Sequence, residues 1–195
     1  VDGIMIVTPY YSKPSQHGIL RHFEEISKIT DLPIMAYNIP GRTSTLIELE
    51  TLQTLVVDIG IHSIKDAVGD FEFSKKQLEL LKDKADIYSG NDNQTYDFVI
   101  NGGVGVVSVA SHVVGDEISE MISFAKDNDL EKAEEINMQL SNLFESIFEE
   151  PSPGPIKKIL SESWEEVGEP LLPITTITPE LANKIRGFYK KIKEN

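Results

Sequence analysis

Short apolar runs alternate with longer amphipathic stretches over roughly the first half of the chain. Five runs are nearly continuous in apolar residues, as strands of a parallel sheet are. They span residues 3–8, 33–38, 62–66, 86–89 and 104–110. Apolar residues recur at helical spacing over residues 16–30, 47–57, 71–81 and 94–101. A strand followed by a helix, repeated along a chain, is the βα unit of a parallel sheet.

After the fifth run, the sequence carries only helical patterns. The predicted helices span residues 112–127, 130–148, 155–163 and 179–193. Proline and glycine residues separate the later helices, at 151–155 and again at 168–173, because both residue types interrupt helices. The pattern predicts an α/β domain at residues 1–127 and a helical C-terminal domain at residues 128–195.

Two architectures accept such repeats, the open doubly wound sheet and the closed (β/α)8 TIM barrel. Doubly wound nucleotide-binding sheets usually carry a glycine-rich loop after a strand, whereas the glycines at 102–105 precede one. Five units cannot close a barrel that needs eight. The chain also begins inside a β-rich segment, with its first methionine at Met5. We therefore expect the C-terminal part of a TIM barrel, strands 4 to 8, with the N-terminal units missing.

Polar side chains follow the predicted strands, where barrel enzymes carry their chemistry. Lys65 ends a buried strand among small and apolar neighbours. Burial lowers the pKa of a lysine, and its neutral amine attacks carbonyl groups to form a Schiff base. The alternative is a lysine that reaches solvent or pairs with Asp66, and spacing alone favours it. The preceding strand end shifts the balance, because it places a tyrosine beside this amine.

That tyrosine is Tyr37, and Arg42 follows it in a Pro-Gly turn. A buried phenol can supply the proton that expels water during Schiff-base formation, although a tyrosine packed in the core is common. An arginine in this position is suited to binding a substrate carboxylate through two hydrogen bonds. A solvated loop arginine is the alternative. Paired carboxylates for glycoside hydrolysis are suggested by Asp66, Asp92 and Asp97. Strand-end or helix-capping roles explain these residues as well.

Charge and composition narrow the function classes. The 195 residues include 18 Lys and Arg against 32 Asp and Glu, a formal net charge of −14. This charge argues against nucleic-acid binding, because affinity for a polyanion comes mainly from basic side chains. No apolar run reaches the roughly 18 residues of a membrane helix, and no signal peptide is recognisable. We expect a cytoplasmic protein that binds neither nucleic acid nor membrane.

The absence of cysteine excludes disulfides, thiolate zinc sites and thiol nucleophiles. The four histidines fit no zinc-binding spacing. We therefore expect no metal site. We expect no cofactor either, because the Schiff base would form on the protein's own lysine.

Short segments along the whole chain, in order, resemble one enzyme family. These segments span residues 7–11, 14–16, 37–43, 64–70, 88–92, 102–109 and 151–157. Together they resemble the dihydrodipicolinate synthase and N-acetylneuraminate lyase family of class I aldolases. The Tyr-Asn-x-Pro-x-Arg-Thr motif at 37–43 is similar to the synthase branch. Sialate lyases usually have a different residue at the position of Arg42.

The resemblance implies a reaction and roles for particular residues. Lys65 would form the Schiff base with pyruvate, and the resulting enamine would attack L-aspartate 4-semialdehyde to give 4-hydroxy-tetrahydrodipicolinate in lysine and diaminopimelate biosynthesis. Tyr37 would be the acid and base at the Schiff base. Arg42 would hold the carboxylate of the semialdehyde.

The resemblance also implies an assembly and two lining positions. Tyr11 would reach into the neighbouring subunit's site, within a homotetramer built from dimers. The main chain at Val107 and the turn at Gly90 would line the pocket. Two alternatives stay open. One is a sister sugar-acid aldolase such as N-acetylneuraminate lyase, and the other is a truncated, non-catalytic fragment or assembly module.

Overall fold

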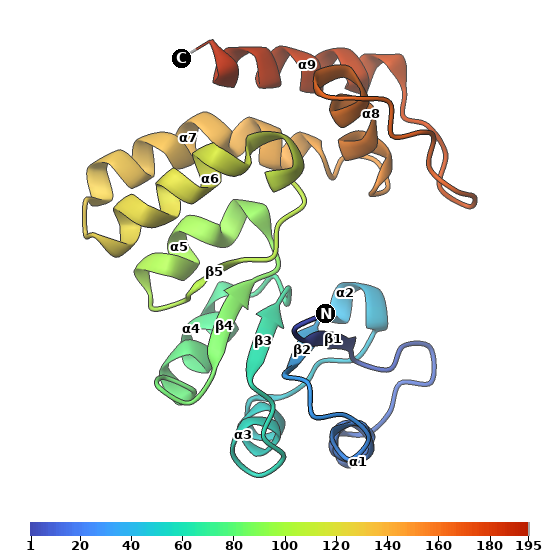
Figure 1. Ribbon diagram of the computed structural model, residues 1–195, viewed down its shortest axis with the longest axis vertical. Helices are drawn as coiled ribbons and strands as arrows, with labels where there is room; N and C mark the ends of the chain where they lie inside the picture. Colours follow the sequence, from blue (N-terminus) through green and yellow to red (C-terminus); the bar gives the residue numbers. More distant parts are fainter. Residues whose placement is uncertain (195) are drawn as a thin grey trace. The chain divides into compact units, whose positions relative to one another are not determined.

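The computed structural model describes residues 1–194. The chain divides into two compact units, one at Val1–Val107 and one that begins at Ser108, and both are coloured by sequence in Figure 1. The predicted domain boundary after residue 127 stays a prediction.

The first unit contains a parallel sheet of five strands, which confirms the predicted strands. They are β1 (Ile4–Val7), β2 (Ile34–Asn38), β3 (Ser63–Asp66), β4 (Asp86–Ser89) and β5 (Gly105–Val106). Each strand pairs in parallel with its neighbours in sequence, in the order β1-β2-β3-β4-β5. The last strand is shorter than the predicted run 104–110, because its ladder with β4 comprises only two residue pairs.

The strand order separates the two candidate architectures. A doubly wound sheet reverses its strand order at a switch point, and this sheet keeps one direction throughout. Right-handed crossovers that advance in one direction place their helices on one face of the sheet. The arrangement is that of an arc of a barrel, and closure by further strands stays a prediction.

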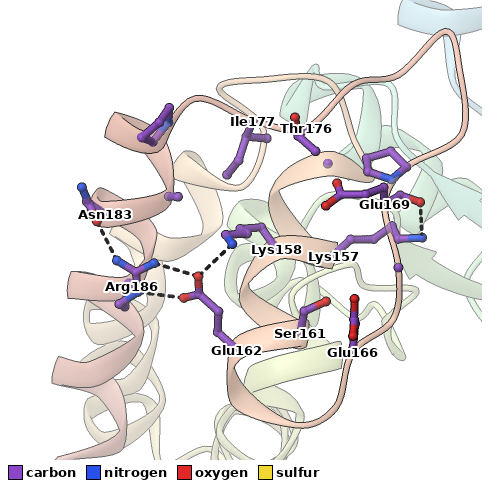
Figure 2. Close-up of a pocket in the computed structure, with 15 residues that line it drawn as sticks. Lys157, Lys158, Ser161, Glu162, Glu166, Glu169, Thr176, Ile177, Asn183 and Arg186 are labelled. Atoms are coloured by element: carbon purple, nitrogen blue, oxygen red, sulfur yellow. Dashed lines mark hydrogen bonds and ion pairs between the residues drawn. The ribbon is translucent and has the colours of Figure 1, made fainter.

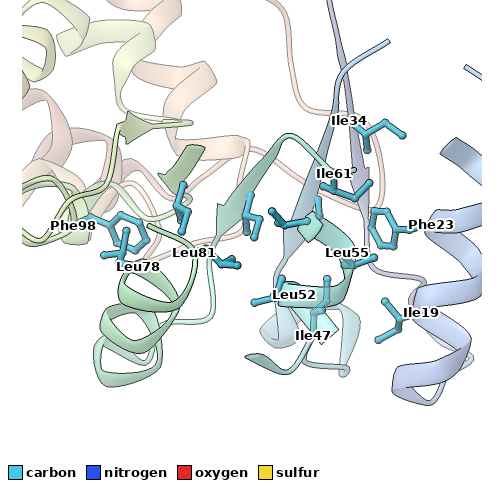
Figure 3. Close-up of a cluster of buried hydrophobic side chains, with 14 residues drawn as sticks. Ile19, Phe23, Ile34, Ile47, Leu52, Leu55, Ile61, Leu78, Leu81 and Phe98 are labelled. Carbon is cyan, nitrogen blue, oxygen red and sulfur yellow. The ribbon is translucent and has the colours of Figure 1, made fainter. Parts of the chain in front are cut away.

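Helices on that one face enclose the core. They are α1 (Gln16–Ser27), α3 (Leu49–Val57), α4 (Phe71–Leu80) and α5 (Thr95–Ile100), the last preceded by the 3₁₀ turn η1 (Asp92–Gln94). Figure 3 shows side chains such as Phe23, Leu52 and Phe98 from these helices, clustered with residues of the strands. Alternate strand residues, among them Ile34 and Ile64, face this core.

Side-chain caps explain where two of these helices begin. The Ser15 hydroxyl accepts a hydrogen bond from the Gly18 N–H at the start of α1. The Asp70 carboxylate accepts from the N–H groups of Glu72 and Phe73 at the start of α4. Each cap satisfies amides that the first helical turn leaves unpaired.

One short helix was not expected from the sequence. The Pro-Gly segment predicted as a turn forms a one-turn helix, α2 (Pro40–Thr43). Proline is favoured at the first position of a helix because its missing N–H would be unpaired there. Ser44 ends the turn with a φ of 58°. Arg42 therefore projects from a helical turn that directly follows β2.

The second unit is helical, as the sequence predicts. It comprises α6 (Ser111–Lys126), α7 (Leu130–Ser146), α8 (Gly154–Ser163) and α9 (Pro179–Lys193). Helix α6 packs on α7 and α8, and α9 packs on α7 and α8. None of the helices described for residues 1–194 is both long and apolar enough to cross a membrane.

Candidate active site

Two predicted site residues lie side by side on neighbouring strands. The ladder pairs Tyr37 of β2 with Lys65 of β3, and Lys65 with Tyr88 of β4. Successive residues of a strand point to opposite faces, and the core residues Ala36 and Ile64 face the helices. Tyr37, Lys65 and Tyr88 therefore share the face that the crossover helices leave uncovered.

The amine of Lys65 lies over the ring of Tyr37. The distance from Lys65 Nζ to the ring centroid is 4.1 Å, within the range of a cation–π contact. Partial burial lowers the pKa of Lys65 below its usual value, and the negative charge of Asp92 partly offsets this effect. Burial therefore favours the neutral amine, which is the nucleophilic form.

Burial acts in the opposite direction on Tyr37. It raises the pKa of the phenol, and the positive charge of Arg42 partly counteracts it. The neutral phenol therefore keeps its proton at neutral pH and can donate it. A proton donor and an amine whose charged form is disfavoured thus occupy adjacent strand ends, a combination typical of functional sites.

Gly90 gives the Lys65 side chain its space. A Cβ at this position would lie 2.8 Å from Ala67 Cβ, closer than real side chains come, and 3.1 Å from Lys65 Cε, a tight contact. The Gly90 N–H donates to the Asp66 carbonyl at 2.5 Å, and the Val107 N–H donates to the Ser89 carbonyl at 2.9 Å. Gly90 thus follows the carboxyl end of β4, which pairs with the Lys65 strand, and Val107 follows the end of β5, one strand further along the sheet.

The residues that follow Tyr37 and Lys65 are buried and polar. Asn38 pairs with Asp66 across β2 and β3, and Asp66 with Ser89 across β3 and β4. All three are almost fully buried, on the face opposite Lys65. Each strand thus presents one side chain to the site and the next to the connecting segments behind it.

Asp66 shows what these buried polar residues do. Its carboxylate accepts hydrogen bonds from the Val68 N–H, the Ser74 hydroxyl and the Gln77 amide. Burial raises the pKa of this carboxyl group, and those three hydrogen bonds oppose the shift. The contacts join the end of β3 to the start of α4, which holds the backbone beside Lys65.

The structure leaves two predicted residues apart from this pair. Tyr11 has a φ of 67° and is 94% exposed, so residues 1–194 leave its side chain almost wholly uncovered. Arg42 is exposed on α2, yet its charge affects the phenol of Tyr37. A role for Tyr11 in a neighbouring subunit stays a prediction.

Asp92 was predicted only as a possible paired carboxylate or a strand-end or capping residue, and its effect on Lys65 was not predicted. It begins η1, is 2% exposed, and its charge acts on Lys65. Its place directly after a strand end was the available signal, but a strand-end or capping aspartate has the same local pattern. Only the fold brings its charge close enough to act on the amine.

The second unit contains a hollow, the α8–α9 cavity, with a volume of about 570 Å³. Lys157, Lys158 and Glu162 of α8 and Arg186 of α9 line it, as Figure 2 shows. None of the predicted site residues lines this cavity. Within residues 1–194, no cluster of three or more His, Cys, Asp or Glu side chains could hold a metal ion.

Comparison with known proteins gives one consistent result. The sequence pattern of the "Dihydrodipicolinate synthetase family" matches residues 1–192. A 4-hydroxy-tetrahydrodipicolinate synthase of Listeria monocytogenes serotype 4b is 36% identical over 194 residues, which covers 100% of this chain and 66% of the relative. One from Halalkalibacterium halodurans is 42% identical over 180 residues, covering 92% of this chain and 61% of the relative.

Solved structures agree with this result. The dihydrodipicolinate synthase of Thermotoga maritima superposes with a TM-score of 0.95 at 32% identity, covering 98% of this chain and 66% of that one. The chloride-inhibited enzyme of Acinetobacter baumannii, complexed with pyruvate, superposes with a TM-score of 0.94 at 31% identity and the same coverage. The chain thus spans about two thirds of the length of these relatives.

Proposed function

The chain belongs to the dihydrodipicolinate synthetase family, and on that premise we propose that it carries the Schiff-base site of a 4-hydroxy-tetrahydrodipicolinate synthase. The observation that carries the proposal is the Lys65 amine, 4.1 Å from the centre of the Tyr37 ring, with its pKa lowered by burial. The complete enzyme would be a TIM barrel to which this chain contributes the last five strands and the helical region.

The first half of the reaction joins Lys65 to pyruvate. The neutral amine attacks the C2 carbonyl carbon, and the carbinolamine loses its hydroxyl group as water to give the imine. Tyr37 donates the proton for that departure, since its raised pKa keeps it protonated. Loss of a C3 proton then converts the imine into a nucleophilic enamine.

The second half forms the carbon–carbon bond. The enamine carbon attacks the aldehyde carbon of L-aspartate 4-semialdehyde, whose carboxylate Arg42 binds. The amino group of that substrate then displaces Lys65 from the imine carbon, which closes the ring and frees the lysine. The net balance is one pyruvate and one semialdehyde giving 4-hydroxy-tetrahydrodipicolinate and one water.

The assembly is part of the proposal. Tyr11 projects from its strand-end loop with 94% of its surface exposed, which suits a residue that enters a neighbouring subunit's site. We place it there as a proton relay to Tyr37, within a homotetramer built from dimers. No metal and no cofactor take part, because the lysine itself activates the pyruvate.

The direct test is borohydride trapping with pyruvate, followed by mass mapping of the peptides. We expect a reduced pyruvyl adduct on Lys65. The same measurement on a fusion that adds the N-terminal third of the Listeria monocytogenes relative tests the chain within a complete barrel. Absence of an adduct from both folded proteins would refute the proposal.

The alternative activity of a sugar-acid aldolase is distinguished from the synthase activity by the second substrate, the aldehyde. Arg42 favours a carboxylate-bearing semialdehyde over a neutral sugar chain. Turnover of pyruvate with L-aspartate 4-semialdehyde, and not with N-acetylmannosamine, supports the synthase. The opposite preference would support the lyase.

A non-catalytic assembly module is the second candidate, favoured by the two edge strands of the sheet. The chain spans 66% of the Listeria monocytogenes relative, and its sheet ends in β1 and β5, whose outer edges are then open to pairing. An adduct in the fusion but not in the chain alone would identify this role for the separate chain.

A further inference from the structure

The segment that joins α2 to α3 is held by two side-chain amides. Residues 46–48 have no regular secondary structure. The Gln16 amide donates to the Leu46 carbonyl at 2.8 Å and accepts from the Glu48 N–H at 3.1 Å. The Asn38 amide donates to the Ile47 carbonyl and accepts from the Ile47 N–H, both at 3.0 Å. We call this arrangement the two-amide clamp.

The clamp imitates a strand pairing. A side-chain amide offers one carbonyl acceptor and N–H donors. It can therefore donate to a backbone carbonyl and accept from a backbone N–H at the same time, as a residue of a neighbouring strand does. Asn38 and the side chain of Ile47 are fully buried, and Figure 3 shows Ile47 in the core cluster. A buried backbone group left without such a partner costs about 1–3 kcal/mol.

The clamp closes a loop that contains Arg42. Asn38 bonds to a residue nine positions later, and the only charged side chain in residues 38–47 is Arg42. Helix α2, which carries Arg42, has only four residues, too few to be stable without tertiary support. The position of the guanidinium therefore depends on what holds the two ends of this loop.

The end of α2 is tied into the same structure. The Thr43 hydroxyl hydrogen-bonds to the carbonyls of Ile39 and Thr45, and it accepts from the Thr45 N–H. The segment that the clamp holds begins at Leu46, directly after Thr45. The backbone is thus held continuously from the end of β2, through α2, to the start of α3.

We propose that Gln16 and Asn38 are positioning residues for Arg42, and hence for the carboxylate of the second substrate. This inference rests on the proposed function, because it assigns Arg42 to that carboxylate. Gln16 acts from the first turn of α1, which lies outside the closed loop and does not line the Tyr37–Lys65 site. Its loss therefore affects capture of the second substrate and leaves Schiff-base formation intact.

The test compares Gln16→Ala with Gln53→Ala, which removes an exposed glutamine from α3. Both variants are made in the polypeptide that gives the pyruvate adduct. For Gln16→Ala we expect a KM for L-aspartate 4-semialdehyde about tenfold higher, with trapping of pyruvate on Lys65 unchanged. Gln16→Glu keeps the acceptor for the Glu48 N–H but loses the donor to Leu46, so its KM should fall between those of Gln16→Ala and the parent.

Hydrogen exchange gives a readout that needs no activity. Gln16→Ala should lower the protection of the amides in residues 42–48, and Gln53→Ala should not. Unchanged protection there, or equal losses in kcat/KM for both substrates, would overturn the positioning role. If neither the unaltered chain nor the unaltered fusion forms a pyruvate adduct, the proposed function fails. In that case, lost protection in Gln16→Ala would still show that Gln16 holds the segment 46–48. The role of this segment in binding the substrate carboxylate would be refuted together with the proposed function.

Discussion

Two regions of the molecule hold basic side chains among polar neighbours, with opposite consequences. At the strand ends, burial disfavours the charge of Lys65, which lies over the Tyr37 ring. In the α8–α9 cavity, Glu162 accepts hydrogen bonds from Arg186 Nε and Nη2, both at 2.7 Å, and Lys158 lies 3.2 Å away. These contacts lower the pKa of Glu162 to about 2.

The contrast shows why the α8–α9 cavity is not the better candidate for chemistry. Each charge at Glu162 and Arg186 is stabilised by its partner, since the pKa of Arg186 is raised as that of Glu162 falls. A pair of groups that both keep their ordinary charges stabilises the structure and supplies no neutral nucleophile. Lys65 instead lies where its neutral form is favoured, and a poised protonation state is what covalent catalysis requires.

The largest expected effect is on pyruvate trapping, and it distinguishes Lys65 at the strand ends from Lys158 in the α8–α9 cavity. Lys65→Arg should abolish the pyruvate adduct, a loss of at least about 10³-fold, because a guanidinium stays protonated and cannot form the imine. Lys158→Arg keeps the charge in the α8–α9 cavity and should leave trapping unchanged. Peptide mapping after borohydride reduction measures both. An adduct that persists in Lys65→Arg would place the nucleophile elsewhere.

Two tyrosines, each beneath a lysine, offer the next comparison. Tyr37→Phe keeps the ring under Lys65 but removes the proton donor, so trapping should slow by about 100-fold. In the second unit, Lys193 Nζ lies 5.8 Å from the Tyr189 ring centroid, and Tyr189→Phe should have no effect. Single-turnover trapping rates of Tyr37→Phe, Tyr189→Phe and the parent measure this difference. Equal rates for Tyr37→Phe and the parent would remove Tyr37 from the acid–base role.

The pH dependence of amine reactivity gives a smaller effect. Burial lowers the pKa of Lys65, whereas a hydrogen bond from Lys132 to Asp129 raises the pKa of Lys132 in the second unit. As pH rises, Lys65 should therefore lose its proton first. Competitive acetylation near pH 8 should label Lys65 several-fold faster than Lys132, after correction for exposure. Faster labelling of Lys132 would contradict the assigned environments.

The smallest effect concerns stability. The folded-state pKa of Glu162 lies below its usual 4.5, at about 2, so its contribution is present above about 4.5 and is lost as the pH falls toward 2. Its side chain is 27% accessible, and ion pairs so near solvent contribute at most about 1 kcal/mol. Glu162→Gln should lower the free energy of unfolding by about that amount at pH 7.

Urea unfolding measures this loss, with Glu166→Gln as the control from the same cavity. The difference between Glu162→Gln and the parent should vanish as the pH approaches 2. Trapping on Lys65 should be unaffected throughout. A difference that grows on acidification would mean that Glu162 stabilises the fold by another route.

Much of the fold follows from local patterns in the sequence. The predicted bounds of β4 and α9 agree with the structure, and most other elements differ from prediction by one to three residues at their ends. Helical periodicity, proline and glycine act over a few residues, so they are readable without the fold. Two elements depart further: β5 is only two residues long, and α2 was not expected, because a Pro-Gly signal fits a turn and a first helical turn equally well.

The sequence by itself determined the order of strands and helices and the reactive residue types at the strand ends, because these depend on short-range patterns. The tertiary structure alone decided how the site is built. Lys65 gains its depressed pKa from burial across neighbouring strands, and Gln16 reaches a carbonyl thirty residues away. Burial, electrostatic effects on a pKa and such amide contacts arise only when distant segments pack together.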